Sequence, residues 1–309
     1  MADWYRPAGS ASDGPWALSV TPARGDGLAY ASLRVLELTP GAAQRLETGA
    51  DEVIVLPLAG GCEVSTGPVT FVLNGRASVF EAVSDFCYLP RATAATLSSA
   101  GGGRFALATA VATRRLDPAY GPAEEVPVEL RGAGQAARQV NNFLAPEAFP
   151  ADKLVAVEVL TPDGNWSSYP PHKHDECRAG EAVLEEIYYF EIAARGGSAG
   201  FGLHRLYTAD GEIDLTETVR TGDVVLIPRG YHGPSVAAPG YPMYYLNVLA
   251  GPAEERTMAF CDDPAHAWVR SSWAGQPPDP RLPLCTAAGP RAGDSAASQT
   301  RTITSSATA

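Results

Sequence analysis

Two closely spaced histidines form the densest cluster of reactive side chains in the sequence. His172 and His174 flank Lys173, directly after two prolines. On an extended strand, residues two positions apart face the same side, so the two imidazoles can point together while Lys173 points away. Two imidazoles at this spacing suit one divalent metal ion. A pair of solvated histidines on a loop would explain the spacing equally well.

Two later segments offer further metal ligands. Glu185 and Glu186 open an apolar segment, 185–190, that is typical of a strand, so one of the two carboxylates can face inward. A buried strand at 223–227 leads into a Pro-x-Gly turn that delivers His232. Three imidazoles and one carboxylate form a nitrogen and oxygen donor set suited to one zinc, manganese or iron ion.

The elements that must position these side chains are short β-strands. Apolar segments rich in β-branched and aromatic residues alternate with Gly, Pro and Asp-Gly turns, and helical periodicity is weak. This pattern is typical of an all-β sandwich or barrel. The expected strands lie at 52–56, 69–73, 85–89, 154–160, 186–190, 201–207, 223–227 and 244–249. One short helix is expected over 135–143.

An internal repeat links the two halves of the chain. Residues 85–91 resemble residues 223–229, and the segment that starts at Glu52 resembles the one that starts at Glu186. The two matches have nearly the same offset, so one loop could absorb the difference. Either two similar β domains follow each other, or two β-rich segments match by chance.

The repeat divides the chain into three expected parts. They are an N-terminal β domain at 1–125, a second β domain at 126–285, and a tail at 286–309. All five histidines lie in the second half, so the first domain cannot build the same metal site. We expect it to be structural or to mediate dimerisation. The tail is poor in large apolar residues, and we expect it to be disordered.

Composition excludes several classes of protein. The chain has 309 residues and a formal net charge of −12, which disfavours binding to nucleic-acid phosphates. No apolar stretch approaches the roughly 18 residues of a membrane span, and the first residues lack the features of a secretory signal. Five scattered cysteines without a CxxC motif argue against a disulfide framework, so we expect a cytoplasmic protein.

The order of the candidate ligands resembles the two motifs of the cupin superfamily, which are small jelly-roll β-barrels. The pattern is His-x-His, a Glu on the next strand, and Pro-x-Gly with a third His, although His232 follows Gly230 by two positions where three are common. Longer motifs are similar to the 5-deoxy-glucuronate isomerase family of myo-inositol catabolism. They lie at 168–175, 184–190, 228–232 and 240–247. This resemblance covers about residues 15–275 and implies two tandem cupin domains.

The resemblance also implies an activity and a ligand set. The activity is an aldose–ketose isomerisation of 5-deoxy-D-glucuronate to 5-dehydro-2-deoxy-D-gluconate, by metal-assisted proton or hydride transfer. The cupin pattern points to His172, His174, Glu186 and His232 as metal ligands, with Glu186 the catalytic carboxylate. Glu185 would act as a base only if a strand irregularity turned it inward.

The implied substrate is a sugar acid whose carboxylate lies far from its aldehyde. A planar guanidinium would hold that carboxylate with two parallel hydrogen bonds, and Arg205 and Arg229 are the candidates. A surface salt bridge would explain each arginine equally well. Tyr188, Tyr231 and Tyr245 could place hydroxyls near sugar oxygens or pack the barrel. We also expect a homo-oligomer, because proteins with two cupin domains commonly pair through sheet edges.

Two other functions remain open at this level. A mixed histidine and glutamate site also serves Fe(II)-dependent dioxygenases. A cupin could equally bind sugar acids or metal without catalysis. The long family-specific motifs favour the isomerase over both.

Overall fold

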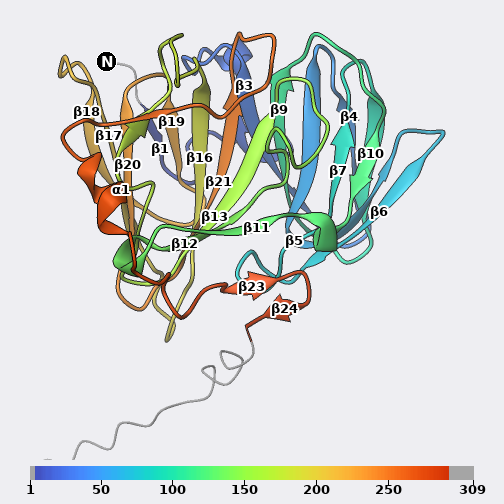
Figure 1. The fold of residues 1–309 in the computed structure, drawn as a ribbon. Coiled ribbons are helices and arrows are strands. Elements are labelled where there is room, and N and C mark those ends of the chain that lie inside the picture. Colours follow the sequence, from blue (N-terminus) through green and yellow to red (C-terminus); the bar gives the residue numbers. More distant parts are fainter. Residues whose placement is uncertain (1–3, 292–309) are drawn as a thin grey trace, which may run out of the picture.

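The computed structural model describes residues 4–291, which fold almost entirely into β-strands. Figure 1 shows two curled groups of strands side by side, one from each half of the chain. Each group closes around an apolar interior of its own. The expected all-β class with two barrels is therefore confirmed.

The N-terminal barrel is organised around one long strand that takes part in both of its walls. Its strands are β2 (Trp16–Val20), β3 (Ala31–Leu38), β4 (Ala42–Glu47), β5 (Asp51–Ser65), β6 (Thr70–Arg76), β7 (Phe86–Leu89), β8 (Ala94–Ser99), β9 (Gly103–Val111) and β10 (Ala119–Gly121). One wall has the order β10-β7-β5-β9-β3-β2. In the other wall, β5 pairs with β6 and β8, and β8 also pairs with β4. The long β5 therefore closes the barrel.

The C-terminal barrel is formed by two separate sheets. Its strands are β1 (Tyr5–Arg6), β11 (Val128–Arg131), β12 (Arg138–Asn141), β13 (Val155–Thr161), β14 (Trp166–Ser167), β15 (His172–Lys173), β16 (Glu185–Ile192), β17 (Gly202–Tyr207), β18 (Asp214–Val219), β19 (Val224–Ile227), β20 (Tyr231–Ala237), β21 (Met243–Ala250) and β22 (Cys261–Asp262). One sheet has the order β1-β19-β16-β21-β13-β12-β11. The other has the order β18-β17-β20-β15-β22, with β14 paired to β20.

The largest sheet of each barrel is buried on both faces, because the two barrels pack against each other through an apolar interface. On β5, Val53 and Val55 point into the N-terminal barrel, whereas Ile54 and Leu56 belong to a second core between the barrels. On β16, Ile187 belongs to the same shared core. Strands buried on both faces are continuous apolar runs, which explains the unbroken hydrophobic segments of the sequence.

Pairing registers correct the expected correspondence between the two halves. Val53 pairs with Leu89 of β7, and Glu186 pairs with Ile227 of β19. Leu89 and Ile227 each precede the proline of the repeated motif, so Val53 corresponds to Glu186. The match of Glu52 with Glu186 was therefore wrong by one residue, and a one-residue slip places a side chain on the opposite face of the sheet.

Three other expectations about local structure need correction. Residues 135–143 do not form the expected helix. A 3₁₀ turn covers 134–136, and residues 138–141 form strand β12, because their backbone pairs with β13. Strand β1 lies far outside the second domain in sequence, yet it pairs with β19. Residues 286–291 are ordered, since β23 (Cys285–Thr286) and β24 (Gly289–Pro290) form a hairpin. The rest of the expected tail lies outside the described residues.

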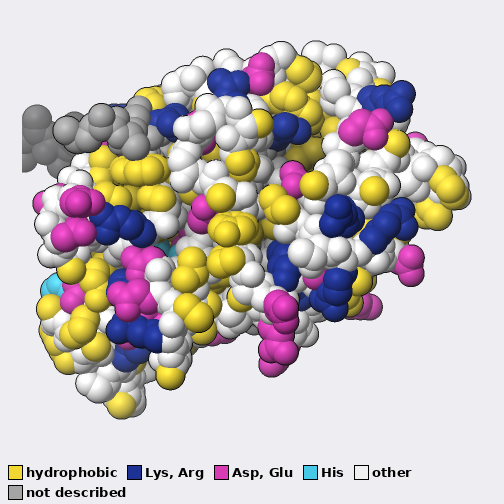
Figure 2. Space-filling view, turned by 90° about the horizontal axis from the view of Figure 1, so that it is seen from above, with side chains coloured by type: hydrophobic (Ala, Val, Ile, Leu, Met, Phe, Trp, Pro, Cys, Tyr) yellow, Lys and Arg dark blue, Asp and Glu magenta, His cyan; other side chains and the backbone are white. Residues whose placement is uncertain are grey.

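Helices contribute little to this fold. The one α-helix among residues 4–291 is α1 (Trp268–Ser272), and the 3₁₀ turns cover 22–24, 123–125 and 134–136. None of the described helices has the length and apolar character needed to cross a membrane. Basic and acidic side chains are interspersed over the face seen from above in Figure 2.

Candidate active site

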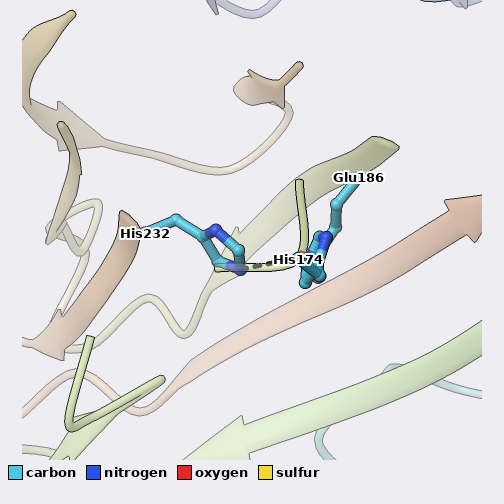
Figure 3. Close-up of side chains that lie close together, drawn as sticks. All are labelled: His174, Glu186 and His232. Carbon is cyan, nitrogen blue, oxygen red and sulfur yellow. Dashed lines mark hydrogen bonds and ion pairs between the residues drawn. The ribbon is translucent and has the colours of Figure 1, made fainter. Parts of the chain in front are cut away.

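Three of the four expected metal ligands converge inside the C-terminal barrel. His174 follows β15, Glu186 lies at the start of β16, and His232 lies on β20; all three side chains are buried. Glu186 Oε2 lies 2.9 Å from His174 Nε2 and 3.0 Å from His232 Nε2 (Figure 3). Two ligand atoms held at a right angle about 2.1 Å from one ion would be about 3.0 Å apart, so these separations fit a shared cation.

The outer nitrogens of the two imidazoles determine how the inner ones are presented. His174 Nδ1 donates to the carbonyl oxygen of Leu184 at 2.8 Å, and His232 Nδ1 donates to that of Gly230 at 3.1 Å. A neutral imidazole that donates through Nδ1 offers a lone pair at Nε2. Both lone pairs then face a carboxylate oxygen, an arrangement that a shared cation stabilises. A carbonyl that orients a ligand histidine in this way is typical of metal sites.

The ionisation states of Glu186 and His172 also suit a metal ion. Burial would raise the pKa of Glu186, but the two neighbouring imidazoles reverse this and hold it well below the usual range. Burial and the neighbouring histidines lower the pKa of His172 well below its usual value. At neutral pH, Glu186 therefore carries its charge and His172 is neutral, which are the forms that bind metals.

His172 lies beside the group formed by the other three ligands. It pairs in register with His232, and the two ring centroids are 4.5 Å apart. Its centroid lies 6.3 Å from that of His174 and 4.7 Å from that of Phe260. The three ligand atoms that lie within 4.8 Å of one another do not include an atom of His172. The structure therefore places His172 at the edge of the site.

Glu185 lies outside the site. Its carboxylate accepts hydrogen bonds from the backbone N–H groups of Ala29 and Tyr30, each at 2.7 Å, and of Ala31 at 3.3 Å. These residues belong to the other barrel. Since β16 is regular here, adjacent side chains face opposite sides, and the Glu185 carboxylate points away from the metal-ligand candidates.

A cavity of about 60 Å³ is lined by His172, His174 and Glu186, and two of the expected tyrosines line it as well. The hydroxyls of Tyr188 and Tyr245 each lie 3.0 Å from Ser168 Oγ. Burial raises the pKa of both phenols, so their hydroxyls stay protonated at neutral pH. The third, Tyr231, is half-buried beside Tyr207 and is not among the residues that line the cavity.

The two arginines expected to hold the substrate lie on the surface. Arg205 is exposed next to buried His204 on β17, and its guanidinium lies 3.5 Å from the carboxylate of Asp214. Arg229 is paired with Asp210 at 3.1 Å and with Glu212 at 2.5 Å. Neither arginine lines the cavity. Strand alternation separates Arg205 from the inward face, which the sequence could not identify.

A different arginine does reach this cavity. Arg138 of β12 lines the cavity, and its side chain is buried. Within residues 4–291 no carboxylate lies within 4.0 Å of its guanidinium, and Nη1 donates to the Ala136 carbonyl at 3.1 Å. Burial lowers its pKa to about 10, so it remains charged at neutral pH. Sequence reasoning missed Arg138 because it lies in the segment expected to be helical.

Comparison with known proteins agrees with the fold and the motifs. Residues 4–269 match the KduI/IolB family. A 5-deoxy-glucuronate isomerase from Geobacillus thermodenitrificans is 42% identical over 256 residues, which are 82% of this chain and 90% of the relative. The crystal structure of an IolB-like protein from Salmonella typhimurium LT2 is 33% identical, with a TM-score of 0.79, and covers 87% of this chain and 99% of that one.

A more distant structure supports the fold alone. Oxalate decarboxylase from Lactobacillus farciminis is 13% identical, with a TM-score of 0.61, over 85% of this chain and 89% of its own. This likeness confirms two cupin-type barrels. The family match spans both of them. The chain therefore belongs to the KduI/IolB family, as its sequence motifs implied.

Proposed function

We propose that the chain is an aldose–ketose isomerase that converts 5-deoxy-D-glucuronate to 5-dehydro-2-deoxy-D-gluconate. The family membership and the activity named for its relatives support this function. The observation that carries the proposal is the convergence of His174, Glu186 and His232 beside a cavity that Arg138 lines, with no carboxylate partner for its guanidinium within residues 4–291.

We propose that one divalent ion is held by His174, Glu186 and His232, with His172 as the fourth ligand beside them. When bound, such an ion would act as a Lewis acid that stabilises negative charge on the carbonyl and adjacent hydroxyl oxygens. The donor set suits zinc, manganese or iron. His174 and His232 are held in place by the carbonyls of Leu184 and Gly230, so the ligands are oriented before an ion arrives.

Arg138 is the residue we assign to the substrate carboxylate, in place of Arg205 and Arg229. A buried guanidinium without a carboxylate partner is costly, and a bound anion would satisfy it. The planar group would hold the carboxylate with two parallel, charge-assisted hydrogen bonds. This contact would fix the distance between the carboxylate end of the sugar acid and the reacting carbons.

The hydroxyl groups of the cavity would orient the sugar oxygens. Tyr188 and Tyr245 stay protonated and can donate to them, and Ser168 holds the two phenols together. Apolar Met258 and Phe260 line the same cavity and would exclude water from the reacting carbons. These contacts would only position the substrate. The acid–base group would then transfer the proton.

Isomerisation moves one proton from the hydroxyl-bearing carbon to the aldehyde carbon and another from the hydroxyl to the carbonyl oxygen. No oxidant or reductant is consumed. Both ring nitrogens of His174 are engaged, the phenols stay protonated and His172 is assigned to the ion, so Glu186 is the group to which we assign the proton transfer. Such acid–base catalysis contributes roughly 10²–10⁴-fold to a rate.

The decisive experiment combines elemental analysis of the purified protein with an NMR assay on 5-deoxy-D-glucuronate. We expect about one divalent ion per chain and appearance of the ketose signals without oxygen consumption. Oxygen uptake in place of ketose formation would support the dioxygenase alternative. Binding of the sugar acid without turnover by the metal-loaded protein would contradict the isomerase proposal.

The free state of the described cysteines suits a cytoplasmic enzyme, and we expect a homo-oligomer.

A further inference from the structure

The N-terminal barrel contains a cavity that the isomerase function does not use. It has a volume of about 470 Å³, and residues from β2, β3, β4, β5, β7 and β9 line it. Its place in the barrel matches that of the active site. Val53, which lines it, corresponds to Glu186, and Leu107, which pairs with Arg34, corresponds to Asn247.

The two cavities differ in the chemistry of corresponding positions. By the same registers, Arg34 corresponds to Val157 and Asp51 to Leu184. Two apolar wall residues of the active site are thus replaced by a cation and an anion, and the metal ligand Glu186 is replaced by valine. The N-terminal cavity therefore lacks the metal-binding carboxylate and has two charged residues where the active site has apolar ones.

Arg34 presents unsatisfied donors to this cavity. Within residues 4–291 its side chain makes no hydrogen bond, and its Nε is buried. Its guanidinium carbon lies 5.3 Å from the centroid of the Trp16 ring, which holds the planar group by cation–π contact. A buried donor without a partner costs free energy, so a ligand that accepts from it would be stabilised.

Asp51 limits what that ligand can be. Burial raises the pKa of Asp51, and no ion pair shorter than 4.0 Å joins it to Arg34 in the described part of the chain. A dianion such as phosphate would be repelled by the Asp51 carboxylate. A monocarboxylate that carries hydroxyls would place its anion at Arg34 and a hydroxyl donor at Asp51. Trp16 offers a flat apolar face to the carbon skeleton.

We propose that the N-terminal cavity is a second, non-catalytic site that binds a small sugar acid through Arg34, Asp51 and Trp16. Val53 stands in the place of Glu186 and cannot bind a metal ion, so binding there leads to no turnover. This inference goes beyond the isomerase reaction and does not depend on it.

The test is a calorimetric titration of the full-length protein with D-gluconate, a sugar acid that lacks an aldehyde. Arg34→Met should weaken binding at one site by about tenfold or more, because the charge-assisted contact is lost. Arg45→Met is the matched control, because Arg45 lines the same cavity but is exposed and paired with Glu47. The control should bind as the wild type does.

Three outcomes would overturn the proposal. They are wild-type affinity and stoichiometry in Arg34→Met, an equal loss in Arg45→Met, and inorganic phosphate binding to the cavity as tightly as gluconate. Arg34→Met should keep the wild-type melting temperature and wild-type turnover of 5-deoxy-D-glucuronate, which separates lost binding from misfolding. A chain that binds gluconate at this cavity but turns over no sugar acid would refute the isomerase and leave this inference intact.

Discussion

Glu52 and Glu185 occupy corresponding positions in the two barrels, and each binds the backbone of the other barrel. Glu52 accepts backbone N–H bonds from residues 152–154 at 2.8, 2.5 and 2.6 Å, just before β13. Glu185 accepts them from residues 29–31, at the start of β3. The two carboxylates therefore join the barrels by the same contact made in opposite directions.

We predict that Glu185→Gln destabilises the fold and leaves the metal site intact. The amide can accept fewer of the three hydrogen bonds and carries no charge, so the free energy of unfolding should fall by about 1.5–3 kcal/mol. Urea denaturation and elemental analysis would measure both effects. Glu63→Gln, an exposed carboxylate on β5, is the control and should change stability by less than about 0.5 kcal/mol. Loss of bound metal in Glu185→Gln would argue against this role.

This pair of glutamates shows how far sequence reasoning reaches. Alternation on a strand implies that Glu185 and Glu186 face opposite sides, but local sequence does not say which side is the barrel interior. The repeat aligned Glu52 with Glu186 because both start similar apolar runs. Only the pairing of Val53 with β7 and β9 shows that Glu52 corresponds to Glu185.

The other site residues also divide into those with a local sequence signal and those placed by distant strands. The spacing of His172 and His174 and the turn before His232 are local signals, so the sequence predicted them. Arg138 could not be found, because its strand is defined by pairing with β13, and its exposure to the cavity depends on side chains from distant strands. Arg205 was misplaced for the same reason.

Removal of one metal ligand should abolish activity. We expect Glu186→Gln and His174→Gln to lose bound metal and to lower kcat by about 10³-fold, since Lewis-acid stabilisation is worth several kcal/mol. Elemental analysis and the NMR assay would report both quantities. His266→Gln serves as the control because His266 lies outside the cavity. Wild-type turnover by a metal-free variant would contradict the assignment.

His172→Gln separates a ligand from a proton carrier. We predict a clear drop in metal occupancy, because the His172 ring lies beside that of His232 and is neutral at physiological pH. Full occupancy with a low kcat would mean that His172 carries the proton and is not a ligand. The variant should therefore be assayed for metal content before activity.

Arg138→Met should impair recognition of the substrate carboxylate. We predict a fall in kcat/KM of about 10–100-fold, mostly through KM, because a charge-assisted contact worth about 1.5–3 kcal/mol is lost. Arg205→Met and Arg229→Met are matched controls on the surface and should stay within about twofold of the wild type. An analogue with an amide in place of the carboxylate should be turned over equally by Arg138→Met and wild type. An unchanged kcat/KM in Arg138→Met would reject this assignment.

The free energy of unfolding at acid pH should depend on Glu181. Burial would raise its pKa, but hydrogen bonds from Lys173 and Cys261, at 2.8 and 3.0 Å, lower it to about 2. A depressed folded-state pKa adds stability that is complete above the unfolded pKa of about 4.3 and is lost as pH falls toward 2. We predict that Glu181→Gln lowers the free energy of unfolding by about 2 kcal/mol at pH 7.

The difference between wild type and Glu181→Gln should shrink as the pH falls, because protonation removes the same charge from the wild type. Urea denaturation at pH 7, 4 and 3 would follow it. Glu176→Gln removes another partner of Lys173, but Glu176 is exposed, so its effect should stay below about 1 kcal/mol at every pH. A difference that stayed constant from pH 7 to pH 3 would show that Glu181 stabilises the fold by packing, because packing does not titrate.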